Sequence, residues 1–189
     1  MTGGTEIDKD GLAKILDDLK RSGRKARKMW QVLYDFGCRY AASADHIMSL
    51  VSQDPDFTAP MLMCRFFSIE LLLKFFLVID HRSVSNKTDL KVVGVNLRGH
   101  DYTPLFDEIQ PEYRRAIAEW FSTISAKPTS EMEFRNLLAQ FEKGFIKWRY
   151  IYEEEQVQFI DGRDLYNING ALGKCAEAEA RRRGHIKSP

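Results

Sequence analysis

Apolar residues recur at steps of three and four along most of the chain, which is the spacing of one face of an α-helix. The pattern predicts a short helix over 8–20 and long helices over 24–51, 60–80, 131–155 and 164–183. Two further short helices are expected to open at Pro104 and Pro111, because proline suits the first turn of a helix. Thr103, directly before Pro104, is expected to cap the first of these helices.

Residues 81–102 are the least regular part of the chain and are rich in Ser, Asn, Gly and charge. Within them KVVGV (91–95) is predicted as a short strand, and no longer alternating pattern occurs. The fold class predicted is therefore an all-α bundle of four to five main helices with short extra helices. We expect an N-terminal extension over 1–23, one domain over 24–183 and a flexible tail over 184–189.

The helix predicted over 131–155 carries a continuous aromatic and apolar stripe. Its members are Phe134, Leu138, Phe141, Phe145, Trp148 and Tyr152. A stripe at helical spacing is far more often core than a base-stacking surface, and this one ends in three acidic residues that repel phosphate. It is expected to be buried against the helix over 60–80.

Glu70 lies in that apolar helix, where a carboxylate needs a partner. Its local candidate is Lys74, four residues on, and its cross-helix candidate is Arg149 beside the aromatic stripe. We predict a Glu70–Arg149 ion pair that sets the register of the two helices, because an arginine can pair with a carboxylate and still stack on a ring. The alternatives are a local Arg149–Glu153 pair and Arg149 as a phosphate ligand.

Composition narrows the class of protein. The chain has 189 residues, of which 44% are hydrophobic and 29% charged, as is typical of a globular domain. Its net charge is +1, so no overall positive potential favours nucleic acid or membrane surfaces. Basic runs over 20–28 and 181–187 are expected to be a solvated helix face and a tail. The three cysteines form no CxxC pair, which predicts buried free thiols and, with a polar N-terminus, a cytoplasmic protein.

Three segments taken together resemble the HEPN superfamily (higher eukaryotes and prokaryotes nucleotide-binding) and its uncharacterised bacterial branches. They are SIELLLKFFLVID (68–80), GHDYTPLFDEI (99–109) and FIKWRYIYE (145–153). The resemblance rests on an apolar helix with a Glu and a Lys four apart, a Gly-His-Asp helix start, and a late Arg-Tyr pair. It implies a helical bundle that commonly pairs as a homodimer.

Many HEPN proteins are metal-independent ribonucleases, often toxins or parts of antiviral systems, with an arginine followed after four to six residues by a histidine. That pair suits RNA cleavage, since the histidine handles a proton and the arginine stabilises phosphorane charge. Here Arg135 and Asn136 fit the start of the signature, but Gln140 stands where the histidine is expected. Arg39 and His46 have the right spacing on the wrong helix.

His100 is open to two interpretations at this stage. It is either a general acid or base at a helix start, or a brace for the preceding loop that is tied to Asp101. No HExxH, phosphate-binding glycine loop or nucleophile elbow occurs in the sequence, and no cofactor or metal is predicted.

The leading hypothesis is therefore a HEPN-like, non-catalytic binding or accessory module that acts with nucleic acid, a nucleotide or a partner protein. The resemblance implies a homodimer and a toxin–antitoxin or defence setting, with an antitoxin or nucleotidyltransferase as partner. No membrane contact is expected. A divergent endoribonuclease and a purely structural interaction module are the alternatives.

Overall fold

The structure, a computed structural model, describes residues 27–81, 84–142, 144 and 162–186. Its elements are α2 (Met29–Val51), a 3-10 turn η1 (Pro55–Phe57), α3 (Thr58–Val78), α4 (Lys87–Val92), α5 (Tyr102–Asp107), α6 (Pro111–Ser125), α7 (Glu131–Gln140) and α9 (Gly162–Arg182). No strand occurs in these ranges, and the predicted all-α class is confirmed. The helix predicted over 8–20 lies outside the described residues.

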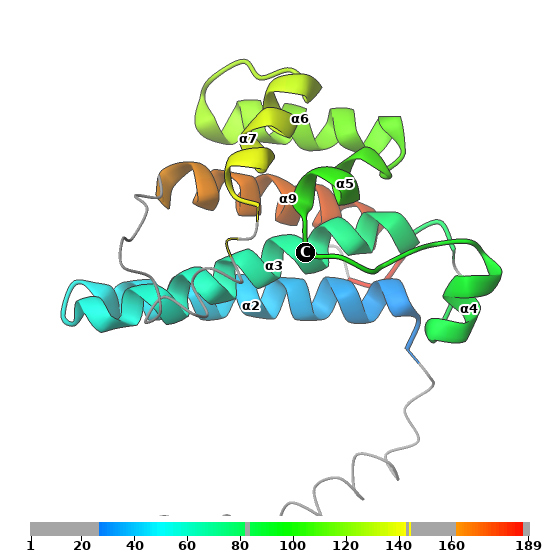
Figure 1. Cartoon of the computed structure of the whole chain (residues 1–189), viewed down its shortest axis with the longest axis horizontal. Helices are drawn as coiled ribbons and strands as arrows, with labels where there is room; N and C mark the ends of the chain where they lie inside the picture. The colour runs from blue at the N-terminus through cyan, green and yellow to red at the C-terminus, as the bar shows by residue number, and fades with distance from the viewer. Residues whose placement is uncertain (1–26, 82–83, 143, 145–161, 187–189) are drawn as a thin grey trace, which may run out of the picture.

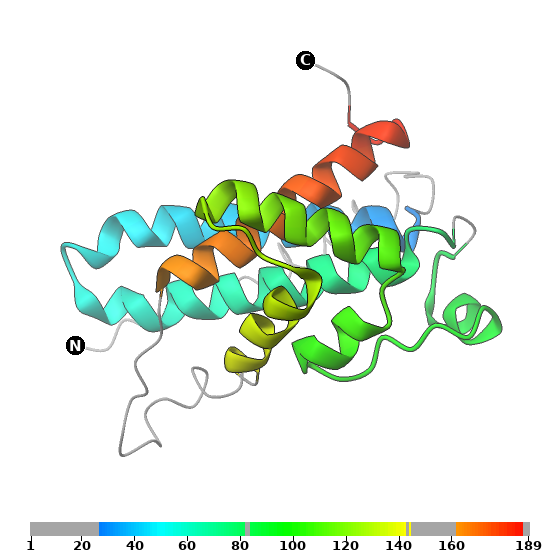
Figure 2. The same ribbon diagram turned by 90° about the horizontal axis from the view of Figure 1, so that it is seen from above.

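The helices are stacked in layers (Figure 1). The long α2 and α3 run antiparallel and form one layer, α9 crosses this pair, and α6 covers the other side of α9. The short α7 packs on α6 and α5, and α5 also packs on α3, while α4 lies outside the stack, near the end where α2 begins (Figure 2). Such crossing layers bury one apolar stripe of each helix.

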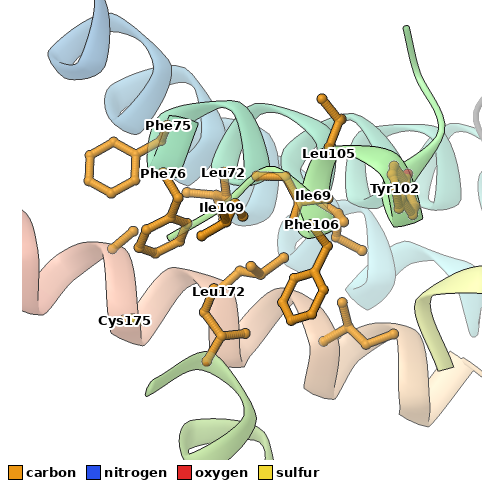
Figure 3. Close-up of a cluster of buried hydrophobic side chains, with 14 of the residues drawn as sticks. Ile69, Leu72, Phe75, Phe76, Tyr102, Leu105, Phe106, Ile109, Leu172 and Cys175 are labelled. Carbon is orange, nitrogen blue, oxygen red and sulfur yellow. The ribbon is translucent and has the colours of Figure 1, made fainter. Parts of the chain in front are cut away.

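The helix with the most buried side chains is α3, which lies between α2 and α9. Figure 3 shows side chains of α3, α5 and α9 meeting in one cluster, with Leu72 and Phe76 of α3 near Leu172 of α9. Burial of this kind is the main stabilising contribution in a domain of this size. No helix in the described ranges is both long and apolar enough to cross a bilayer.

The helix predicted over 131–155 is not continuous, because the chain turns at 141–142. Ser130 caps α7 through a reciprocal pair of hydrogen bonds with Glu133, but the helix ends at Gln140 and Phe141 turns out of it. Phe134 and Phe141 are buried as predicted. However, α7 packs mainly on α5 and α6 rather than on the helix over 60–80. The rest of the stripe, Phe145 to Tyr152, lies outside the described residues.

Two local predictions between α3 and α6 are also wrong. KVVGV begins within a helix, because the Asn86 side chain accepts from the N–H groups of Thr88 and Asp89 and so fixes the first turn of α4. The next helix, α5, begins at Tyr102, with Asp101 rather than Thr103 in the capping position. Pro111, by contrast, opens α6 as predicted.

The C-terminal basic run is not simply solvated. The Arg183 side chain is 5% exposed and its Nη2 lies 2.6 Å from Asp80 Oδ1. His185, in the predicted tail, lies with Nε2 2.8 Å from Asp35 Oδ1, and its ring packs on Trp30 and Tyr34. Residues after α9 therefore close onto the start of α2, a long-range contact that a local charge pattern does not report.

Candidate functional site

Glu70 is the buried charge around which the candidate site is built. It lies in the middle of α3, and its side chain is 3% exposed. A carboxylate removed from water to this degree is stable only when it is paired and hydrogen-bonded. Both of its oxygens have such a partner.

The two partners come from different elements. Lys74, one turn further along α3, places Nζ 2.6 Å from Glu70 Oε1. His100, in the loop before α5, places Nδ1 2.9 Å from Glu70 Oε2. Since the carboxylate can only accept, Nδ1 of the imidazole carries the proton and Nε2 is the nitrogen left for other contacts.

The two partners differ sharply in exposure. The Lys74 side chain is 11% exposed, so its charge serves mainly to neutralise Glu70. The His100 side chain is 56% exposed, so its ring reaches the surface while one nitrogen is held from inside. A buried acid that fixes an exposed imidazole is an arrangement that orients the ring for proton transfer or for anion binding.

The residues on either side of His100 restrict the conformation of its loop. Gly99 has φ +94°, a left-handed conformation that L side chains rarely adopt, and a residue with a Cβ would be strained there. Tyr102 is buried and donates its hydroxyl to the Phe66 carbonyl at 2.8 Å. Burial, and then the neighbouring Glu70 charge, raise the pKa of the Tyr102 phenol well above its usual value.

The start of α5 has one more anchor. The Thr103 N–H donates to Glu142 Oε1 at 3.1 Å, which joins α5 to the turn that follows α7. The imidazole is thus presented from a rigid base rather than from a free loop.

These contacts support one element of the structural interpretation of His100. The ring braces its loop against α3, as the structural interpretation expected, but its partner is Glu70 and not Asp101. Asp101 is half-buried at the capping position of α5, without a side-chain cap hydrogen bond. Arg149 lies outside the described residues, and the Glu70–Arg149 pair stays a prediction.

The ribonuclease candidates on α7 are held in a different way. Arg135 donates from Nε and Nη2 to the two carboxylate oxygens of Asp107, both at 2.6 Å. The hydrogen bond from Arg135 lowers the pKa of Asp107. Asn136 and Gln140 are exposed on the same helix. Within the described ranges no histidine contacts Arg135, and its guanidinium is held in a two-bond ion pair with Asp107.

Arg39 and His46 share α2 and are both exposed. The Arg39 guanidinium lies over the Phe36 ring at 5.9 Å from its centroid. Nothing in the described contacts brings a second catalytic group to His46, whose backbone carbonyl accepts from Ser49.

Sequence reasoning missed two features. Arg98 is exposed in the His100 loop, and its N–H is held by the Asn96 side chain at 3.0 Å. Arg65, which in the sequence only interrupts an apolar run, is buried and hydrogen-bonded to Asn169, 104 residues away. Proximity of Arg98 to His100 could have been read from the sequence, whereas a contact over 104 residues leaves no local signal.

The three cysteines are free, and only Cys175 is fully buried, so the prediction of buried thiols holds for that one. No group of three or more His, Cys, Asp or Glu residues suited to a metal ion occurs in the described ranges.

Comparison with known proteins returned no matching family model, no matching curated protein and no matching solved structure. The HEPN resemblance therefore stays a prediction that rests on the three sequence segments.

Proposed function

We propose that this chain is a HEPN-like helical module that binds RNA through its phosphate groups at the surface around His100, without cleaving it. One observation carries the proposal: the exposed His100 ring is oriented by a buried carboxylate that it shares with Lys74. When the ring is protonated, one carboxylate faces two cations, and the cluster has a net positive charge that favours an anion.

The loop around His100 adds to this charge. Arg98 is exposed two residues away, and a planar guanidinium suits a phosphate oxygen pair. The Arg98 guanidinium provides donors on this short, anchored loop, and His100 Nε2 adds a donor when the ring carries both protons. Phosphate contacts of this kind supply affinity without reading base sequence.

Binding is favoured over cleavage by the state of the other charged groups. Lys74 is almost buried and already bonded to Glu70, so it is poorly placed to stabilise a phosphorane. Arg135, the arginine that the HEPN signature would use, is held by Asp107 on two nitrogens. A single imidazole remains, and cleavage of RNA needs both a base and an acid for the two oxygens of the displacement.

The test is fluorescence anisotropy with a labelled single-stranded RNA over a series of salt concentrations. His100→Ala and Arg98→Ala are each expected to weaken binding and to reduce the slope of log K against log salt by roughly one. Arg39→Ala is the matched control, since it removes an exposed arginine from α2. Equal losses in all three variants, or no loss at His100 and Arg98, would contradict the proposal.

A divergent ribonuclease is the second candidate, and the Glu70–His100 dyad is the observation that favours it. The purified protein is incubated with RNA in the presence of a chelator. His100→Gln retains hydrogen bonding but cannot exchange a proton near neutral pH, so it separates the two functions. If the unchanged protein cleaves RNA, and His100→Gln still binds RNA but no longer cleaves it, the protein is a ribonuclease that uses His100.

The homodimer and the toxin–antitoxin or defence setting belong to the same proposal, because the resemblance implies them. Light scattering is expected to give twice the chain mass of 21.9 kDa. A mass of one chain at micromolar concentration would remove the dimer from the proposal.

A further inference from the structure

A second site is formed where α9 crosses the α2/α3 pair, and it shares no residue with the His100 cluster. The cleft there has a volume of about 360 Å³. Small residues open it on both walls, Ala41 and Ala42 from α2 and Gly170 and Gly173 from α9. Small-molecule sites have volumes of about 300–1,000 Å³, so the cleft fits a compact ligand.

Arg65 of α3 lines this cleft, and it is fixed from the inside. Its side chain is 4% exposed, and Nη1 donates to Asn169 Oδ1 at 3.0 Å. Asn169 donates in turn to Ser68 Oγ at 2.8 Å, and the Ser68 hydroxyl donates to the Gly37 carbonyl at 2.7 Å. This chain of hydrogen bonds spans three helices and holds the guanidinium in one orientation before any ligand arrives.

The outward side of Arg65 is held much less firmly. Its Nη2 lies 2.6 Å from Asp45 Oδ1, but the Asp45 side chain is 55% exposed. The Tyr166 ring lies against the guanidinium, 5.0 Å from Cζ to the ring centroid, and the residue is half exposed. A buried guanidinium needs a counter-ion. Asp45 supplies it from the mouth of the cleft, where water can solvate the carboxylate if it turns away.

We infer that this cleft binds a small aromatic carboxylate, whose carboxylate group takes the place of Asp45 on Arg65. The exchange conserves charge, because the carboxylate of the ligand replaces that of Asp45, which accepts from Arg65 Nη2. The rings of Tyr34 and Tyr166 and the small residues of the walls provide an apolar slot for the body of the ligand. Aromatic rings pair favourably with such side chains.

Charge selects a monoanion over a phosphate dianion. Asp45 and Glu177 both line the cleft, and Lys174 lies 3.6 Å from Glu177 and compensates it. Among the described residues that line the cleft, Arg65 is therefore the cation that displacement of Asp45 makes available to a ligand. A second negative charge on the ligand would lie near Asp45, while Lys174 and Arg181 stay paired with Glu177.

The experiment is isothermal titration of the full chain with benzoate, with neutral benzamide and dianionic phenylphosphonate as matched probes. Asp45→Asn removes the competing carboxylate and leaves Arg65 without its counter-ion. It is expected to bind benzoate at least about ten-fold more tightly than the unchanged protein, which corresponds to 1.4 kcal/mol. Benzoate is also expected to raise the thermal midpoint of this variant, and benzamide is not.

Two further variants locate the effect. Arg65→Lys replaces the planar guanidinium by a single ammonium group and is expected to lose benzoate binding. Tyr166→Ala changes a half-exposed side chain, is expected to weaken benzoate binding, and serves as the test if Arg65→Lys does not fold. Arg39→Lys is the control. The inference is overturned if Asp45→Asn binds no benzoate at millimolar concentration, if benzamide binds equally well, or if neither Arg65→Lys nor Tyr166→Ala changes binding.

Discussion

Replacing Glu70 by methionine tests the charge balance at the centre of α3. The substitution keeps the length of the side chain but removes its charge, and so leaves the Lys74 ammonium without the carboxylate that lies 2.6 Å from it. Both side chains are largely withdrawn from water, at 3% and 11% exposure. Removal of one partner of a buried ion pair costs about 3–5 kcal/mol, because the other charge is left uncompensated.

The second half of this prediction is the double variant. Replacing Lys74 by methionine in the Glu70→Met background removes the stranded charge, and buried ion pairs replaced by apolar residues of similar volume are often neutral or even stabilised. The double variant is therefore expected to recover most of the loss. His100 contributes little to this balance, since its ring is exposed and can return to water.

Urea unfolding followed by far-UV circular dichroism measures the free energies. Arg135→Gln, which breaks an exposed ion pair on α7, is the matched control and is expected to change little. A loss below about 1 kcal/mol in Glu70→Met, the range of exposed ion pairs, would refute the reasoning. So would a double variant as unstable as the single one, an outcome that would point to another cation on Glu70, with Arg149 as the residue that the sequence predicts.

Three further outcomes follow from the packing and the titrating groups. Gly173→Ala is expected to raise the free energy of unfolding by about 0.5–1 kcal/mol, because a Cβ at this position of α9 meets nothing within 4 Å. Gly144→Ala places a Cβ into the Phe66 ring and is expected to lower the free energy of unfolding by about 1–3 kcal/mol. Urea unfolding measures both changes. The pKa of Asp107 is lowered in the folded protein, so its carboxylate stabilises the fold above about pH 4, the pKa of the unfolded chain, and this contribution is lost as the pH falls through the folded pKa. Asp107→Asn should therefore reduce the loss of stability at acid pH, measured by urea unfolding at several pH values. An unchanged pH profile would contradict this. Burial raises the pKa of Cys175 to about 12, so iodoacetamide at pH 8 should label this thiol only when urea unfolds the chain, as followed by mass spectrometry.

Local chemistry explains which elements the sequence predicts well. α2, α3, α6 and α9 carry apolar residues at helical spacing, and Pro111 supports the start of α6, because periodicity and first-turn prolines act within one or two turns of chain. The same local rule misplaced the end of α7. Periodicity continues through Phe141, but the chain turns there, and close packing of Gly144 on the Phe66 ring of α3 is a tertiary contact.

The need of Glu70 for a partner could be read from its apolar surroundings, and Lys74 four residues on was among the candidates. The His100 contact could not, because the resemblance to known segments marks His100 without saying which carboxylate it reaches across 30 positions of chain. Arg65 is the extreme case. In the sequence its charge only interrupts an apolar run. The crossing of α9 over α3 brings Asn169 to Arg65 and so fixes its guanidinium in the wall of a cleft. Sequence alone determines which side chains need a partner, since desolvation follows from the apolar residues around them, whereas the packing of helices decides which partner each one meets.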